Sequence, residues 1–135
     1  WRRWFKPCYR QLFARVRDGG AHVWFHSCGN VTPIIPDLLD LGLNVLHPLQ
    51  PQAMDIAMLG REYGGRLCFF GGVDVQGTLI NGSPADVAAE VRHRIDTLGR
   101  FGGGYIGSTS HTIMPEAPPE NIISMLETFL EYGRP

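Results

Sequence analysis

AHVWFHSCGNVTPIIPDLLDLG, residues 21–42, has the pattern of one β-strand followed by one α-helix. Residues 21–27 are short and apolar with a polar exit, as expected of a buried strand. Thr32 and Pro33 then offer an N-cap and a first helical position for an apolar run over residues 34–41, which a glycine ends. The stretch therefore predicts a complete strand-and-helix unit.

The same unit repeats three more times along the chain. The further strands are predicted over residues 43–46, 66–70 and 105–108, and the helices that follow them over residues 54–63, 84–98 and 120–132. Ser83 and Pro84 supply a cap and a first position for the second of these helices. An additional amphipathic helix is predicted before the first strand, with Pro7 in its first turn.

Four units in series predict an α/β fold with parallel strands and right-handed crossovers. A complete eight-stranded barrel takes about 250 residues, so this 135-residue chain matches half of one. A small doubly wound domain is the alternative that periodicity alone does not exclude. The chain opens on Trp1 inside an apolar pattern, so we expect a piece of a longer protein.

Composition excludes several functional classes. The chain has 12 basic and 13 acidic residues, so no net charge recruits nucleic acid or an anionic membrane surface. Three cysteines without regular spacing argue against a disulfide framework and for the cytoplasm. No apolar run reaches the roughly 20 residues of a membrane span, and there is no signal-peptide pattern.

Polar side chains follow each predicted strand. In chain order they are His26 and Cys28, His47 and Gln50, Asp74 and Gln76, and Ser108 and His111. Because the carboxyl ends of parallel strands meet at one edge of a sheet, we expect these side chains to surround a single mouth.

His26 and Cys28 stand two residues apart at the end of a predicted strand, so both point to the same side. Nitrogen and sulfur together are the donors that zinc prefers. A strand-end histidine packed beside a buried cysteine is the alternative.

Two further residues at the mouth are candidate catalytic groups. Asp74 either orients a metal-bound histidine or a substrate group, or is an ordinary turn aspartate. His47 either enters the pocket or hydrogen-bonds only to backbone. Gln50, Gln76 and Ser108 are candidate substrate contacts.

Residues 23–121 resemble the C-terminal half of the uroporphyrinogen decarboxylase superfamily, which includes that decarboxylase and the cobalamin-dependent methyltransferases. The resemblance rests on four motifs in order: HSCGN at 26–30, NVLHPLQP at 44–51, GGVD at 71–74 and PEAPPENI at 115–122. It implies that residues 1–135 form a partial domain, the C-terminal half of a TIM (β/α)8 barrel without its N-terminal half.

The motifs mix two branches of that superfamily. Its methyltransferases carry His-x-Cys-Gly and use the histidine and cysteine as zinc ligands, which implies the same for His26 and Cys28. Their third ligand is a cysteine shortly before the last Pro-x-x-Pro, where this chain has His111. A histidine there is typical of the decarboxylases, in which it lies in the substrate pocket. His111 is therefore a zinc ligand, a substrate contact or a cap on the last helix.

Three functions follow as hypotheses. The first is a zinc-dependent methyltransferase-like enzyme that moves a methyl group between a corrinoid on a partner protein and a thiol or similar acceptor. The second is decarboxylation of a tetrapyrrole such as uroporphyrinogen, in porphyrin biosynthesis. The third is a non-catalytic half barrel that binds a partner, pairs with the missing half barrel or forms an oligomer. In each case we expect the isolated fragment to be inactive.

Overall fold

The computed structural model describes residues 1–102 and 104–133. Its strands are β1 (Trp24–His26), β2 (Val45–Leu49), β3 (Cys68–Val73) and β4 (Tyr105–Thr109). They form one sheet in the order β1-β2-β3-β4, and every neighbouring pair is parallel. The predicted α/β fold of parallel repeats is therefore confirmed.

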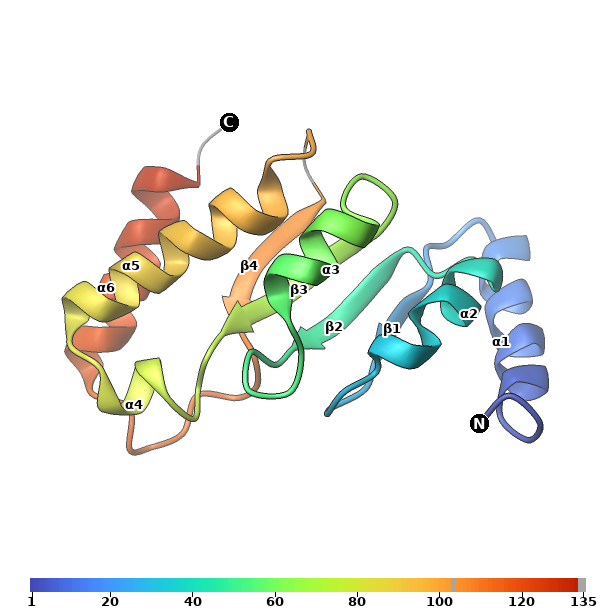
Figure 1. Cartoon of the computed structure of the whole chain (residues 1–135), viewed down its shortest axis with the longest axis horizontal. Coiled ribbons are helices and arrows are strands. Elements are labelled where there is room, and N and C mark those ends of the chain that lie inside the picture. Colours follow the sequence, from blue (N-terminus) through green and yellow to red (C-terminus); the bar gives the residue numbers. More distant parts are fainter. Residues whose placement is uncertain (103, 134–135) are drawn as a thin grey trace.

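Helices cover one face of this sheet. They are α1 (Lys6–Asp18), α2 (Ile35–Asp40), α3 (Ile56–Tyr63), α4 (Thr78–Asn81), α5 (Pro84–Arg94) and α6 (Pro119–Tyr132), with a 3-10 turn η1 (Thr32–Ile34) and a π-helical turn η2 (Ile95–Gly99). In Figure 1, α1 lies beside α2 at one end of the molecule, and α6 lies beside α5 at the other. None of the helices in the described part of the chain has the length and apolar content that crossing a bilayer requires.

Alternate strand residues take opposite faces of the sheet. Phe25, Leu46 and Phe69 are register partners on β1, β2 and β3, and all three are buried in the core under the helices. The residues that alternate with them lie on the other, open face: Trp24, His26, His47 and Phe70. This alternation places the histidines away from the core.

The register of β2 against β3 changes at His47 and Pro48. Leu46 pairs with Phe69, whereas Leu49 pairs with Gly71, so β2 has one more residue than β3 over this step. Such a bulge re-aims the side chains around it. It allows Leu46 and Leu49 both to be fully buried while His47 lies between them on the open face. The strand continues past the bulge, so the predicted span of residues 43–46 is wrong and β2 runs from Val45 to Leu49.

The third strand also continues past its predicted end at residue 70 and runs to Val73. Gly71 has a φ of 109°, and a Cβ there would lie 3.2 Å from both the Leu49 nitrogen and the Thr109 oxygen. Only glycine fits comfortably in this conformation between two neighbouring strands. The Tyr105 hydroxyl donates to the Gly71 carbonyl at 2.8 Å, which fixes the backbone further.

Helix ends follow the local signals only in part. Ser83 caps α5 in a capping box with Asp86, as predicted from the sequence. Thr32 makes no cap, because residues 32–34 instead form the 3-10 turn. Asp55 is the cap of α3 and accepts from the Met58 backbone N–H at 2.9 Å, so that helix starts later than predicted.

Candidate metal centre at the strand ends

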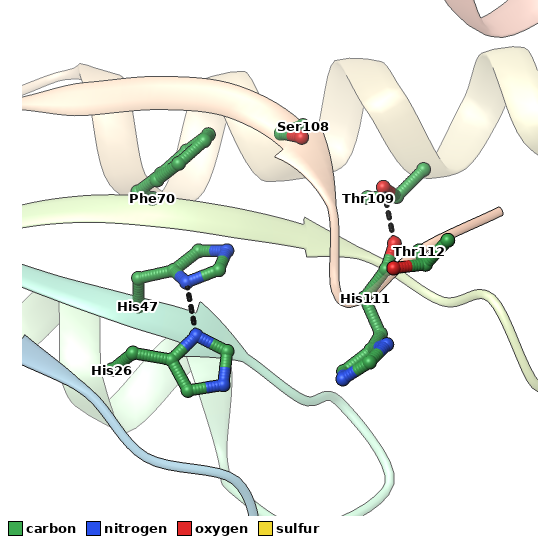
Figure 2. Close-up of a pocket in the computed structure, with 7 residues that line it drawn as sticks. All are labelled: His26, His47, Phe70, Ser108, Thr109, His111 and Thr112. Atoms are coloured by element: carbon green, nitrogen blue, oxygen red, sulfur yellow. Dashed lines mark hydrogen bonds between the residues drawn. The ribbon is translucent and has the colours of Figure 1, made fainter.

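A pocket of about 290 Å³ opens on the uncovered face of the sheet, at the carboxyl ends of its strands. It is drawn in Figure 2, and its lining residues are His26, His47, Phe70, Ser108, Thr109, His111 and Thr112. Of the predicted site residues, three histidines and Ser108 therefore meet in one place. Phe70, Thr109 and Thr112 were not predicted. The strand alternation that puts Cys68 and Phe70 on one face is the signal that could have identified Phe70.

The possible metal ligands converge beside this pocket. One donor atom from each of His26, Cys28 and His111 lies within 4.8 Å of the other two, and all three residues are exposed. The Cys28 Sγ and the His26 Nε2 are 3.6 Å apart. A tetrahedral ion with bonds of about 2.05 Å to nitrogen and 2.3 Å to sulfur separates such a pair by about 3.6 Å. The kinds of donor atom, and the spacing of the Cys28–His26 pair, therefore fit a zinc ion.

The turn that carries Cys28 is held by β2. The Ser27 N–H donates to the His47 carbonyl at 2.9 Å, continuing the strand pairing beyond β1. Gly29 has a φ of 79°, and its N–H donates to the Gln50 Oε1 at 2.6 Å. The structure thus places Gln50, a predicted substrate contact, against the turn that presents the thiol.

His47 contacts His26 through its ring. Their Nδ1 atoms are 2.7 Å apart, and the dashed line in Figure 2 marks this hydrogen bond. The other side of the His47 ring stacks on Phe70, with centroids 4.5 Å apart. Burial, and secondarily the charges of His26 and His111, hold the pKa of His47 below its ordinary value. A low pKa favours the neutral imidazole, which can accept a hydrogen bond.

His111 reaches the site from the far side of the sheet. Its backbone carbonyl accepts from the Thr109 hydroxyl at 2.6 Å, which shapes the loop after β4. The rings of His111 and His26 meet edge to face with centroids 6.3 Å apart. Ser110, which precedes His111, is buried, and its hydroxyl accepts from the Val75 N–H at 3.3 Å. The loop is therefore anchored on both sides of the imidazole.

The structure does not bring Asp74 and Gln76 into the pocket lining. Asp74 is only 4% exposed. One carboxylate oxygen accepts from the Gln52 side chain at 2.6 Å, and the other accepts from the Gln76 backbone N–H at 2.9 Å. One oxygen thus stabilises the turn after β3, and the other links this turn to the loop after β2. A catalytic role for Asp74 stays a prediction.

Comparison with known proteins gives one family and one fold. The family model for uroporphyrinogen decarboxylase (URO-D) matches residues 1–132. A solved methyltransferase from Methanosarcina mazei aligns with a TM-score of 0.76 at 23% identity, over 98% of this chain and 37% of that protein. No curated protein sequence matches the chain.

The structural match supports the fold, in which the parallel repeats are part of a barrel. The chain spans little more than a third of that neighbour's length. The family match covers all of the strands and all of the proposed ligands. The chain therefore belongs to the uroporphyrinogen decarboxylase (URO-D) family.

Proposed function

We propose that the chain is the metal-holding part of a zinc-dependent, methyltransferase-like enzyme of this family. His26, Cys28 and His111 would bind the ion and leave a fourth position for the acceptor. The observation that carries the proposal is the convergence of these three donors within 4.8 Å, although they come from opposite edges of the sheet. Three protein ligands with one open position are typical of catalytic zinc.

Zinc, when bound, would hold a thiol acceptor as its thiolate, the nucleophilic form. The chain's own residues set the surroundings of that acceptor. Ser108 and Thr112 offer hydroxyl groups, while the Phe70 ring gives the pocket an apolar wall. A small acceptor with one apolar part and one hydrogen-bonding part suits this lining. The proposed methyl donor, a corrinoid on a partner protein, follows from the family resemblance.

Histidine in place of a third-ligand cysteine has a chemical consequence. A site with two imidazoles and one thiolate carries one negative charge fewer than a site with one imidazole and two thiolates. A zinc ion at the first site would retain more positive charge and would attract an anionic acceptor more strongly. The proposal therefore includes acceptors other than those of the two-cysteine enzymes.

Tetrapyrrole decarboxylation is the second candidate, and His111 is the observation that favours it. This residue lines the pocket together with Ser108, where both could contact a substrate carboxylate or pyrrole group. The His26-Ser27-Cys28 motif argues for methyl transfer instead, because its nitrogen and sulfur donors are spaced as a metal requires.

In either case the chain alone covers part of the catalytic barrel. Trp24 is 54% exposed and Ile106 is 40% exposed, both on strands of the sheet. Large apolar side chains exposed in this way favour association. We therefore propose that the missing half barrel, or another copy of the chain, covers the open face and that the isolated chain is inactive.

Zinc stoichiometry tests the proposed function. Elemental mass spectrometry on the purified chain should give about one zinc per molecule, and the metal should be lost in Cys28→Ala and in His111→Ala. Cys8→Ala and His93→Ala are matched controls on α1 and α5, both exposed, and should keep the metal. A folded chain that binds no zinc would overturn the methyltransferase proposal and favour the decarboxylase-like pocket.

A further inference from the structure

The hydrogen bond between His26 and His47 joins two imidazoles of neighbouring strands. The two residues are register partners on β1 and β2, and their Nδ1 atoms are 2.7 Å apart. One ring must donate its N–H and the other must accept, since two bare nitrogens or two N–H groups would repel each other. Which ring donates decides where the proton of His26 lies.

The position of the second ring nitrogen of His26 indicates which ring donates. Its Nε2 lies 3.6 Å from the Cys28 Sγ, on the side where the possible ligands converge. A neutral imidazole carries one proton, and it binds a metal only through the nitrogen without that proton. If Nε2 of His26 is the ligand atom, the proton is on Nδ1. His26 is then the donor and His47 the acceptor.

We propose that His47 is a positioning residue for this site. By accepting the Nδ1 proton of His26, it fixes the His26 tautomer and ring orientation so that the bare Nε2 faces Cys28. The inference rests on the proposed function for the identity of the ion, but the proton arrangement belongs to the chain itself. In other metal sites the orienting acceptor is a carboxylate, a backbone carbonyl or water; here it is an imidazole.

Three features hold His47 in place for this role. The β2 bulge at His47 and Pro48 sets the ring on the open face, between two buried leucines. Phe70 stacks against the ring and restricts its orientation. The His47 carbonyl accepts from the Ser27 N–H, so β2 also fixes the backbone between His26 and Cys28. His47 therefore orders both the imidazole ligand and the turn that carries the thiolate ligand.

The first test needs no metal. Nitrogen-15 NMR of the imidazoles in the metal-free chain at about pH 8, where histidine is ordinarily neutral, reports which nitrogen carries each proton. We expect His26 to be protonated on Nδ1. His47→Phe keeps an aromatic ring against Phe70 but removes the acceptor, so this preference should be lost. His47→Asn places an amide oxygen near the former Nδ1 and should restore it.

The second test measures affinity for Zn²⁺ by competition with a chelator. His47→Phe should bind about 10–100-fold more weakly than the unaltered chain, and His47→Asn should recover most of the loss. His93→Phe is the control for replacing an exposed histidine elsewhere, and its affinity should not change. Circular dichroism establishes that each variant is folded.

Two results would overturn the inference: protonation of His26 on Nε2 in the unaltered chain, or a folded His47→Phe variant with unchanged tautomer and unchanged Zn²⁺ affinity. The first needs no variant, so a failure of His47→Phe to fold leaves the test decisive. An unaltered chain that binds no Zn²⁺ but has the expected, His47-dependent tautomer would support the positioning role of His47 and overturn the proposed zinc function.

Discussion

The two faces of the sheet differ although the same strands build both. The helix-covered face is apolar and closed, with Phe69 and Leu46 fully buried at its centre. The open face carries His26, His47 and the aromatic Phe70, which together line a pocket. Adjacent residues on one strand therefore belong to different environments. Phe69 packs in the core, whereas Phe70, the next residue, lines the pocket.

This separation means that substitutions on one face should leave the other largely unaffected. The side chains of a strand alternate with a period of two, so neighbours in sequence have different contacts. Phe69 and Phe70 are the matched pair that tests the idea most directly.

Phe69→Ala should have the largest effect on folding. The side chain is fully buried in the main core, so its loss leaves a cavity and should lower the free energy of unfolding by about 3–5 kcal/mol. Phe70→Ala should cost only about 1 kcal/mol, mostly for its contacts with Trp24 and His47. Urea denaturation followed by circular dichroism compares the two. Equal losses would refute the separation of the faces.

Cys28→Ala should affect the open face alone. It removes one of three proposed ligands, so Zn²⁺ affinity should fall by more than the roughly 10–100-fold expected for an outer partner. Without metal, the unfolding free energy should stay within about 0.5 kcal/mol, because the residue is exposed. Chelator competition and urea denaturation give the two values. A large loss of stability in the metal-free chain would show that the thiol is structural.

Gly71→Ala should disturb both faces, since a side chain at this position of β3 would contact the backbones of both Leu49 and Thr109. A side chain at a φ of 109° is strained, and its Cβ would crowd the Leu49 and Thr109 backbones at 3.2 Å. We expect a loss of about 1–3 kcal/mol in unfolding free energy together with weaker Zn²⁺ binding. Gly20→Ala also has a positive φ but no neighbour within 4 Å, and is the control for backbone strain alone. If both variants lose the same stability, crowding at Gly71 is unimportant.

Ser83→Ala should have the smallest effect and leave the pocket unchanged. Loss of this N-cap typically costs about 1 kcal/mol. Hydrogen bonds from the Ser83 side chain and backbone hold the pKa of Asp86 below its ordinary value. The stability linked to Asp86 is thus present above the pKa of the unfolded carboxyl and is lost as the pH falls through the folded pKa.

The difference between Ser83→Ala and the unaltered chain should therefore shrink as the pH drops below about 4. Urea denaturation at a series of pH values measures it. A difference that grows on acidification would contradict the assigned role of the capping box.

Local rules explain why much of the fold was predictable. Ser83, Pro84 and Asp86 form their cap within four residues, so the sequence is sufficient to predict it. The order of strands and helices likewise follows from apolar runs separated by glycines. The positions of His26, Cys28 and His111 at strand ends, together with the family resemblance, predict that these residues lie close together. The structure brings their donor atoms within 4.8 Å of one another. Their role as ligands stays a prediction.

The errors come from contacts between distant segments. The ends of β2 and β3 depend on a bulge and on a glycine wedged between two strands, neither of which periodicity can indicate. The hydrogen bonds that Asp74 accepts from Gln52 and from the Gln76 backbone are likewise not indicated by the sequence pattern, and its catalytic role stays a prediction. Phe70 lines the pocket through alternation with buried Phe69, and an aromatic side chain of this kind does not stand out among the polar residues that follow the strands.

The donors lie on, or directly after, the two outermost strands of the sheet, β1 and β4, which do not pair with each other. Neighbouring strands are about 4.8 Å apart, so in a flat sheet β1 and β4 would be separated by three such spacings, or roughly 14 Å in total. His111 reaches His26 because the loop after β4 returns toward β1 (Figure 2). An ion bound there would act as a clasp that closes most of the chain into one loop. Like a disulfide, such a clasp would restrict the unfolded chain, so metal loading should raise the unfolding temperature as well as equip the site.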